Sequence, residues 1–380
     1  MNDLTAILDH FKARQDSMIG TIREIVDIES PSYDVEQSKA VVGRVEDGFR
    51  NIGLDLSIER IPAGGYGEHL IVRAFPSAAK PVLFVGHTDT VHPVGTNKKN
   101  PTRIEEDKFY GCGIFDMKAN IVVMQEALRY FAETGTWPSR PITIFLSCDE
   151  EVGSITGRAI LEREAANAEL ALVFEPSAEG RIKTGRKGTG MYTLKAHGKP
   201  AHAGLEPEKG ASAILELSRQ IERLHSLNDP AAGTTVNVCT IKGGTTSNVI
   251  PEYAECDVDV RFLTMAEAER VDHAIKSLIT FDERVSVEPI GDINRPPMER
   301  TEAVVSLFEK ARDIAASFDY KLGETQVGGA SDGNFVAALG VPVLDGLGIA
   351  GAGAHTLNEH ILVSDIAKRA TLVTTFLSTI

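Results

Sequence analysis

Histidine and carboxylate residues follow four short apolar runs of this 380-residue chain. The runs and the residues that come after them are 81–85 with His87 and Asp89, 142–146 with Glu150 and Glu151, 170–174 with Glu175, and 341–347 with His355. Imidazole nitrogens and carboxylate oxygens are groups that zinc takes from proteins. Delivery of these groups to one place would therefore make a metal site.

The elements that would position these residues can be predicted from the same runs. Each run is short, apolar and bounded by glycine or proline, which is typical of a strand buried on both faces. Helices are expected between the strands, at 38–51 and from 118 to about 132. The alternation predicts an α/β fold with a doubly wound, mostly parallel sheet, whose ligands bind beyond the carboxyl ends of the strands. We therefore expect the histidines and carboxylates to meet at that edge.

The middle of the chain has a different pattern. Strands are expected at 191–195, 234–242, 254–262 and 285–289, and helices at 209–224 and 266–280. The order β-α-β-β-α-β is that of a ferredoxin-like α+β unit. A helix at 302–317 and the run 341–347 then return to α/β character. We therefore predict a discontinuous larger domain, residues 1–186 and 295–380, with an inserted domain at 187–294.

Charge and cysteine content narrow the class of protein. The net charge of −15 argues against nucleic acid or an anionic membrane as partner, because either needs a basic surface. The four cysteines show no CxxC pairing, which predicts neither a disulfide framework nor a thiolate zinc site. The N-terminal segment 1–20 is charged throughout and has no apolar stretch long enough for a signal peptide or a membrane span. We expect a cytoplasmic protein that acts on a small molecule.

Taken singly, the candidate residues have ordinary structural explanations. His87 and Asp89 could form a turn with an N-capping aspartate, and Asp116 could cap the helix that follows it. Glu150 and Glu151 could begin a solvated helix. Asp89 is also well placed to accept a hydrogen bond from the second nitrogen of a metal-bound His87. Their order along the chain decides between these explanations.

Nine motifs occur in a fixed order along nearly the whole chain. They are GHTDTV (86–91), GxGxxDMK (111–118), DEEVGS (149–154), FEPS (174–177), GKPAHAG (198–204), SNVIP (247–251), DVRF (259–262), GGASDG (328–333) and GAGAH (351–355). With them the chain resembles the two-zinc metallopeptidase family that contains glutamate carboxypeptidase, acetylornithine deacetylase, succinyl-diaminopimelate desuccinylase and the aminoacylases. The motifs are most similar to those of glutamate carboxypeptidase (carboxypeptidase G).

The resemblance implies a centre of two zinc ions, for which cobalt or manganese could substitute. It makes Asp116 the carboxylate that bridges both ions. The other implied ligands form two pairs, His87 with Glu175 and Glu151 with His355. The peptide bond after Asp116 is often cis in this family. Two metals can together lower the pKa of a water molecule that they hold.

The resemblance also implies roles in catalysis. Glu150 becomes the general base, which takes a proton from water and passes it to the leaving amine. Asp89 becomes the residue that orients His87. His202, in the inserted domain, is implied to donate a hydrogen bond to the oxyanion in the site of the partner subunit, which requires a homodimer. Without the resemblance, His202 would be taken for a histidine of a surface loop.

Four further residues are implied in substrate binding. Arg261 would grip the free carboxylate of the substrate, as a bidentate guanidinium can. Asn248 would position the substrate, and the loop with Gly329 would supply backbone donors. Lys183 could meet a second carboxylate, or it could be a solvated lysine at a strand edge. Asn120 stands where many relatives have glycine, which leaves the shape of the pocket open.

We predict that the protein is a metallohydrolase that cleaves an amide bond next to a free carboxylate and releases a C-terminal amino acid such as glutamate. Alternatives within the class are a dipeptidase and a deacylase of N-acyl amino acids, similar to acetylornithine deacetylase or succinyl-diaminopimelate desuccinylase. Outside the class, a catalytically silent relative could bind small metabolites. The complete set of five ligands, together with Glu150, argues against silence.

Overall fold

The computed structural model describes residues 4–380 and divides into two compact units. The larger unit consists of Met1–Thr184, Arg300–Gln326 and Ser331–Ile380, and the smaller of Gly185–Glu299 and Val327–Ala330. The smaller unit therefore interrupts the sequence of the larger one. Residues 1–3 of the charged N-terminal segment lie outside the described range.

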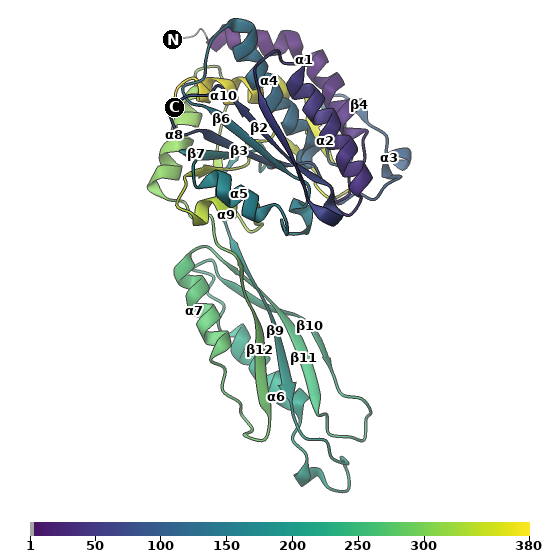
Figure 1. Ribbon diagram of the computed structural model, residues 1–380. Coiled ribbons are helices and arrows are strands. Elements are labelled where there is room, and N and C mark those ends of the chain that lie inside the picture. The colour runs from purple at the N-terminus through teal and green to yellow at the C-terminus, as the bar shows by residue number, and fades with distance from the viewer. Residues whose placement is uncertain (1–3) are drawn as a thin grey trace. The chain divides into compact units, whose positions relative to one another are not determined.

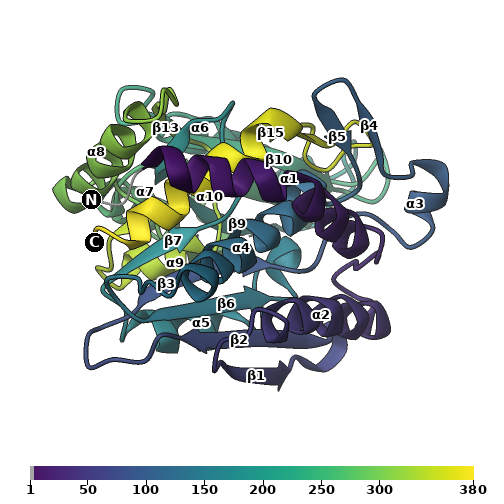
Figure 2. The ribbon, with the colours of Figure 1, turned by 90° about the horizontal axis from the view of Figure 1, so that it is seen from above.

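The larger unit is built on a six-stranded sheet (Figures 1 and 2). Its strands, in spatial order, are β1 (Ser57–Pro62), β2 (Glu68–Ala74), β6 (Ile142–Ser147), β3 (Val82–His87), β7 (Leu170–Val173) and β14 (Val343–Leu344). The last four run parallel, whereas β1 and β2 join antiparallel at one edge. Every residue of β3, β6 and β7 is buried, as expected for strands covered on both faces.

Helices cover both faces of this sheet (Figure 1). One layer contains α1 (Leu4–Val26), α2 (Val35–Arg50), α4 (Ala119–Thr134) and α10 (Val363–Leu377), which pack on one another. On the other side, α5 (Arg158–Ala165) packs against α9 (Gly333–Ala338). The helix α8 (Glu302–Ala316) packs on α10 and β14, and α3 (Thr96–Lys99) is a single turn. The main hydrophobic core lies between the sheet and the helices α1, α2, α4, α8 and α10.

Two further sheets are small. One has the order β15 (Gly351–Ala352), β16 (His360–Leu362), β5 (Lys108–Tyr110) and β4 (Arg103–Glu105). The other pairs β8 (Ile182–Arg186) with β13 (Glu324–Val327). Pairing of β16 with β5 joins the segment before Asp116 to the segment after His355.

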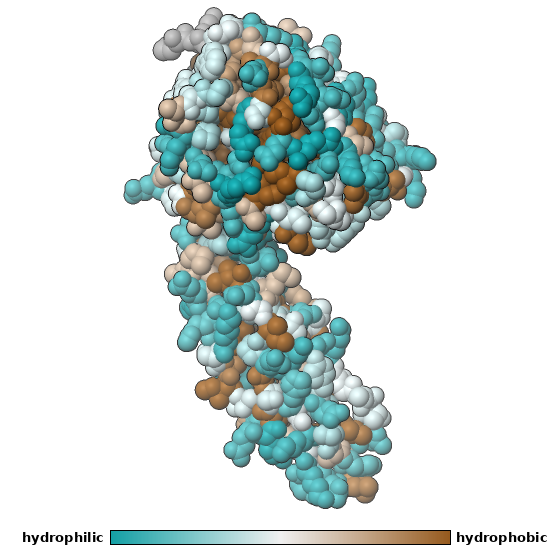
Figure 3. All heavy atoms as spheres, in the orientation of Figure 1, coloured by the Kyte–Doolittle hydropathy of each residue, from teal (hydrophilic) through white to brown (hydrophobic). Residues whose placement is uncertain are grey.

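The smaller unit is an antiparallel sheet with two helices. The sheet has the order β10 (Thr235–Gly243), β11 (Tyr253–Phe262), β9 (Gly188–His197) and β12 (Ser286–Arg295). The helices α6 (Ala213–His225) and α7 (Met265–Lys276) pack on one face and enclose a second hydrophobic core. Figure 3 shows polar and apolar side chains interspersed on the visible surface of this unit.

The structure confirms the predicted fold class, including the ferredoxin-like unit, and differs from the prediction in some element bounds. The run 341–347 pairs as a strand only at β14, two residues long. α6 begins at Ala213 instead of 209, because the Ser212 side chain accepts a hydrogen bond from Leu215 N and caps the helix there. The antiparallel strands β1 and β2 were not predicted. Within residues 4–380, no helix is long and apolar enough to span a membrane.

Candidate metal centre

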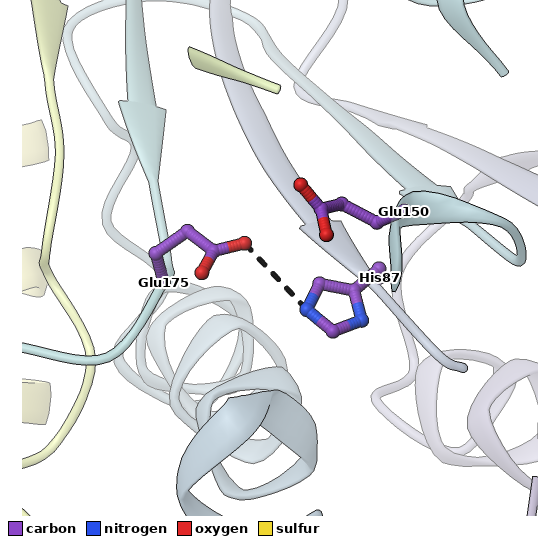
Figure 4. A group of neighbouring side chains, drawn as sticks. All are labelled: His87, Glu150 and Glu175. Atoms are coloured by element: carbon purple, nitrogen blue, oxygen red, sulfur yellow. Dashed lines mark ion pairs between the residues drawn. The ribbon is translucent and has the colours of Figure 1, made fainter. Parts of the chain in front are cut away.

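Three candidate residues lie at the carboxyl ends of adjacent parallel strands. His87 is the last residue of β3, Glu150 begins a 3-10 turn shortly after β6, and Glu175 lies two residues beyond β7. Because these strands run parallel, their carboxyl ends share one edge of the sheet. Figure 4 shows the Glu175 carboxylate pointing toward the ring of His87, with Glu150 beside them. The His87 Nε2 and Glu175 Oε1 atoms are 3.5 Å apart.

Asp116 joins two histidines that are far apart in the sequence. Its Oδ1 lies 3.1 Å from His87 Nε2, and its Oδ2 lies 3.4 Å from His355 Nε2. Glu151 completes the second group, since its Oε2 is 3.2 Å from the same His355 nitrogen. The peptide bond after Asp116 is cis, as the resemblance implies. The two oxygens of one carboxylate thus face two separate groups of donors.

The carboxylates shift the pKa values of the histidines. Hydrogen bonds with Asp116 and Glu151 raise the pKa of His355 to about 10. Burial lowers the pKa of His87, but hydrogen bonds with Asp116 and Asp89 outweigh it and hold the pKa well above its ordinary value. Burial likewise raises the pKa of Asp116, but the two histidines hold it below its usual range. Negative potential is therefore concentrated at the two imidazoles.

Asp89 contacts both His87 and the turn that carries the adjacent glutamates. His87 Nδ1 lies 3.0 Å from the Asp89 carbonyl oxygen and 3.4 Å from its Oδ1. The Asp89 carboxylate also accepts hydrogen bonds from Glu150 N, Glu151 N and Ser32 Oγ, at 3.3, 3.1 and 2.7 Å. One buried carboxylate therefore orients the imidazole and holds the turn with Glu150 and Glu151 against it.

The residues at this edge fit divalent cations. Two groups have ligand atoms that all lie within 4.8 Å of one another, His87 with Glu150 and Glu175, and His87 with Asp116 and Glu151. Glu151 Oε1 is buried and accepts no hydrogen bond from any described residue. A buried acceptor in that condition requires a partner such as a cation. Imidazole and carboxylate donors without thiolates suit zinc, cobalt or manganese.

The smaller unit brings two of its predicted residues together. His202 forms a β-bridge with Val249, and Ala203 N donates to the Asn248 carbonyl oxygen at 2.9 Å. The exposed ring of His202 accepts at Nδ1 from Gly204 N and Leu205 N, both at 3.2 Å. In the neutral ring the proton therefore sits on Nε2, which is a donor.

Arg261 has an acidic partner on its own strand. Its Nε and a terminal guanidinium nitrogen donate to both oxygens of Asp259, at 2.8 to 3.2 Å. This hydrogen bonding raises the pKa of Arg261 further. Asp259 thus takes Nε and one terminal nitrogen, and the Arg261 side chain is about one-third exposed.

Lys183 and Gly329 both take part in backbone hydrogen bonds. Lys183 is in β8, where its backbone exchanges hydrogen bonds with Asp345, at 2.8 and 3.2 Å. Gly329 belongs to the smaller unit, and its carbonyl oxygen accepts from Arg186 at 3.1 Å. Their implied roles in substrate binding stay predictions.

Two buried polar residues near the centre were not predicted from the sequence. Glu359 accepts hydrogen bonds from the loop that carries Asp116, and Asn120 links the residue before Glu175 to the loop that leads to His355. Asn120 was noted only as a departure from glycine. Glu359 follows an asparagine and precedes a histidine in a polar stretch, so no local signal distinguishes it from a solvated carboxylate.

A cavity of the larger unit lies away from these residues. It measures about 640 Å³ and lies against Pro81 and Pro141, which precede β3 and β6 at the opposite edge of the sheet. Its lining contains no histidine, and its Arg73 is already paired with Glu164 at 2.9 Å. Chemistry rather than cavity size therefore assigns the site to the strand ends with the histidines.

Comparison with known proteins agrees with this assignment. Residues 83–379 match Peptidase family M20/M25/M40. The chain belongs to this family. It is therefore a metallohydrolase that cleaves amide bonds.

Individual relatives of this metallohydrolase cover most of its length. It is 31% identical to carboxypeptidase G2 of Pseudomonas sp. (strain RS-16) over 93% of this chain and 87% of the relative. It is 29% identical to the succinyl-diaminopimelate desuccinylase of Delftia acidovorans over 77% of this chain and 80% of the relative. Among solved structures, an aminopeptidase from Bacillus cereus has a TM-score of 0.78 at 24% identity, and covers 96% of this chain and 98% of its own. This last likeness concerns the fold alone.

Proposed function

We propose that the protein is a two-zinc carboxypeptidase that releases a C-terminal amino acid such as glutamate from an N-acyl or peptidyl donor. The observation that carries the proposal is the placement of Asp116, whose two oxygens face different histidines. His87 and Glu175 would hold one ion, and Glu151 and His355 the other. The likeness to carboxypeptidase G2 supports the choice of substrate class.

Glu150 is the proposed general base. When bound, the ions supply Lewis acidity for the scissile carbonyl and for water. Glu150 has a carboxylate oxygen within 4.8 Å of the ligand atoms of His87 and Glu175, so it can take a proton from a water at that place. It would then deliver this proton to the nitrogen of the leaving amine, as a general acid.

Two residues of the smaller unit are proposed to act on the substrate. Both backbone hydrogen bonds to the His202 ring are made at Nδ1. The Nε2–H can therefore donate to the oxyanion that forms on the former carbonyl oxygen. Arg261 would bind the free carboxylate with the terminal guanidinium nitrogen that Asp259 does not take. Asn248, Gly329 and Lys183 would position the substrate from the surrounding loops and strand.

A homodimer is part of this proposal, because His202 is assigned to the partner's site. The smaller unit offers a suitable surface. Its strand β10 is an edge strand, and the unpaired backbone groups of such an edge are available to another chain. Ile241 on β10 is 56% exposed, and Leu215 on α6 is 53% exposed. A cytoplasmic location remains a prediction from the cysteine pattern.

The substrate class can be tested with the purified protein. Zinc-loaded protein and chelated apo-protein would be compared on a panel of N-acyl amino acids and of α- and γ-glutamyl amides. Metal-dependent release of glutamate is expected. Release of acetate or succinate would make the protein a deacylase, as the desuccinylase relatives suggest, and no turnover with metal bound would indicate a silent relative.

Two variants test the assigned residues. Glu150→Gln should keep zinc and the fold but lower kcat by at least about 100-fold, since a general base contributes about 10²–10⁴ in rate. Glu36→Gln, at an exposed carboxylate of α2, is the matched control. Mixing Glu150→Ala with His202→Ala protein should restore activity through hybrid dimers. Near wild-type kcat in Glu150→Gln, or no rescue on mixing, would contradict the respective assignment.

A further inference from the structure

The carboxylate of Glu359 is completely buried and is a point where several hydrogen bonds converge. Its Oε1 accepts from Phe115 N and Asp116 N, both at 2.9 Å. Its Oε2 accepts from Gly113 N at 2.9 Å and pairs with His92 Nε2 at 2.8 Å. The two oxygens together have three hydrogen bonds with the backbone of one loop and one with a side chain. Hydrogen bonds to a buried charged acceptor are among the strongest in proteins.

These contacts join three segments that each carry a proposed ligand. His92 lies five residues after His87, and Asp116 is itself one of the backbone donors. Glu359 lies four residues after His355. One carboxylate thus holds together three segments: the one that follows β3, the one that precedes α4 and the one that precedes β16.

The surroundings of Glu359 fix its place. Lys118, also fully buried, contributes a positive charge nearby and donates to the Ile28 carbonyl oxygen at 2.5 Å. The Glu359 carbonyl oxygen accepts from Gly111 N at 3.2 Å, which ties its backbone to the same loop. The side chain therefore has little freedom to move relative to the segment 111–116.

We propose that Glu359 is a positioning residue of the metal centre, which sets the direction of Asp116 and, through His92, of the segment that carries His87. This inference rests on the proposed metal centre. The Asp116 amide donates to Glu359 while the two oxygens of the Asp116 side chain face the two histidines. A change in the backbone direction at Asp116 would therefore displace both oxygens at once.

A Glu359→Gln variant tests this role. The glutamine amide has one acceptor oxygen and one NH2 group. Its NH2 group would face backbone N–H groups, from which the carboxylate oxygen now accepts hydrogen bonds. The expected result is a folded protein whose zinc affinity is weaker by about 10–100-fold, the usual effect of removing a residue that orients metal ligands. Affinity would be measured by competition with a chromophoric chelator, and folding by circular dichroism.

Glu216→Gln is the matched control. Glu216 is also buried and accepts from the backbone of a loop, with Phe281 N at 2.9 Å and Asp282 N at 3.1 Å, but it belongs to the smaller unit. Glu216→Gln should lower the Tm and leave zinc affinity within about twofold of wild type, because it lies outside the proposed centre. Equal zinc affinity in wild type and Glu359→Gln, or an equal loss in both variants, would overturn the inference.

A second pair of variants keeps the test decisive if Glu359→Gln does not fold. His92→Gln retains an N–H donor for Glu359, whereas His92→Leu removes it. His92→Gln should bind zinc more tightly than His92→Leu, and equal affinities would overturn the inference. Wild-type protein that binds no zinc would instead overturn the proposed function, and the inference with it.

Discussion

Asn120 is the position at which a single substitution should reveal the most about the larger unit. Its side chain is completely buried at the start of α4. Nδ2 donates to the Phe174 carbonyl oxygen at 2.8 Å, and Oδ1 accepts from Ile349 N at 2.9 Å. A Cβ on Gly348 would lie only 2.4 Å from Nδ2, so the side chain is also tightly enclosed. The amide thus connects two segments that approach the metal centre.

In the substitution Asn120→Leu, the leucine side chain is close to asparagine in size but can make neither hydrogen bond. It would leave one buried carbonyl oxygen and one buried N–H unpaired, and each such group costs about 1–3 kcal/mol. The free energy of unfolding should therefore fall by about 2–6 kcal/mol. At about 2 °C per kcal/mol for a unit of this size, the Tm should fall by about 4–12 °C.

Differential scanning calorimetry of the metal-free variant and wild type measures this change. The control is Asn167→Leu, an exposed asparagine just after α5, whose substitution should change stability by no more than about 0.5 kcal/mol. A Tm of Asn120→Leu within about 1 °C of wild type would refute the reasoning. That result would mean that the two buried groups find other partners or are exposed to water.

Three more outcomes can be checked directly. An alkylating reagent should modify the exposed Cys239 quickly and the buried Cys256 slowly, even at pH 9, as followed by mass spectrometry. Burial raises the pKa of Cys256 to about 11, and only the thiolate reacts. Equal rates of modification would contradict this expectation. Gly291→Ala should lower the free energy of unfolding of the smaller unit, measured in urea, by about 1–3 kcal/mol. The φ angle is +133° there, and a Cβ would lie 2.1 Å from the Met191 carbonyl oxygen. An unchanged free energy of unfolding would count against this expectation. Arg261→Lys should raise KM more than it lowers kcat, since lysine cannot bind a carboxylate in bidentate fashion, and a fall in kcat alone would argue against substrate binding.

The buried strands could be predicted because their signal is local. The runs that become β3, β6 and β7 are mostly apolar, and every residue of these strands is buried, as expected for a sheet covered on both faces. In β11, by contrast, alternating burial follows the alternating sequence pattern, as expected for a sheet with one open face. The antiparallel strands β1 and β2 were missed. β1 is largely exposed and carries no such run of apolar residues.

The polar contacts that orient the site could not be predicted in the same way. Glu359 and its donors at Gly113 and Asp116 are 246 and 243 residues apart in the sequence. Asn120 and Ile349 are 229 residues apart. Hydrogen bonds across such separations follow from packing and leave no periodic pattern in the chain. For the same reason, nothing local indicated that Asp89 also accepts from the turn with Glu150.

The sequence by itself determined the residue types of the site and their delivery to one edge of a sheet. Parallel strands have their carboxyl ends on the same side, so a histidine or glutamate just after each buried run must arrive there. Only the tertiary structure decided which atoms face each other. It placed one Asp116 oxygen toward His87 and the other toward His355, and it set Glu359 behind them. Those choices depend on how loops distant in sequence pack together, because a side chain's partner is set by distance in space rather than by its place along the chain.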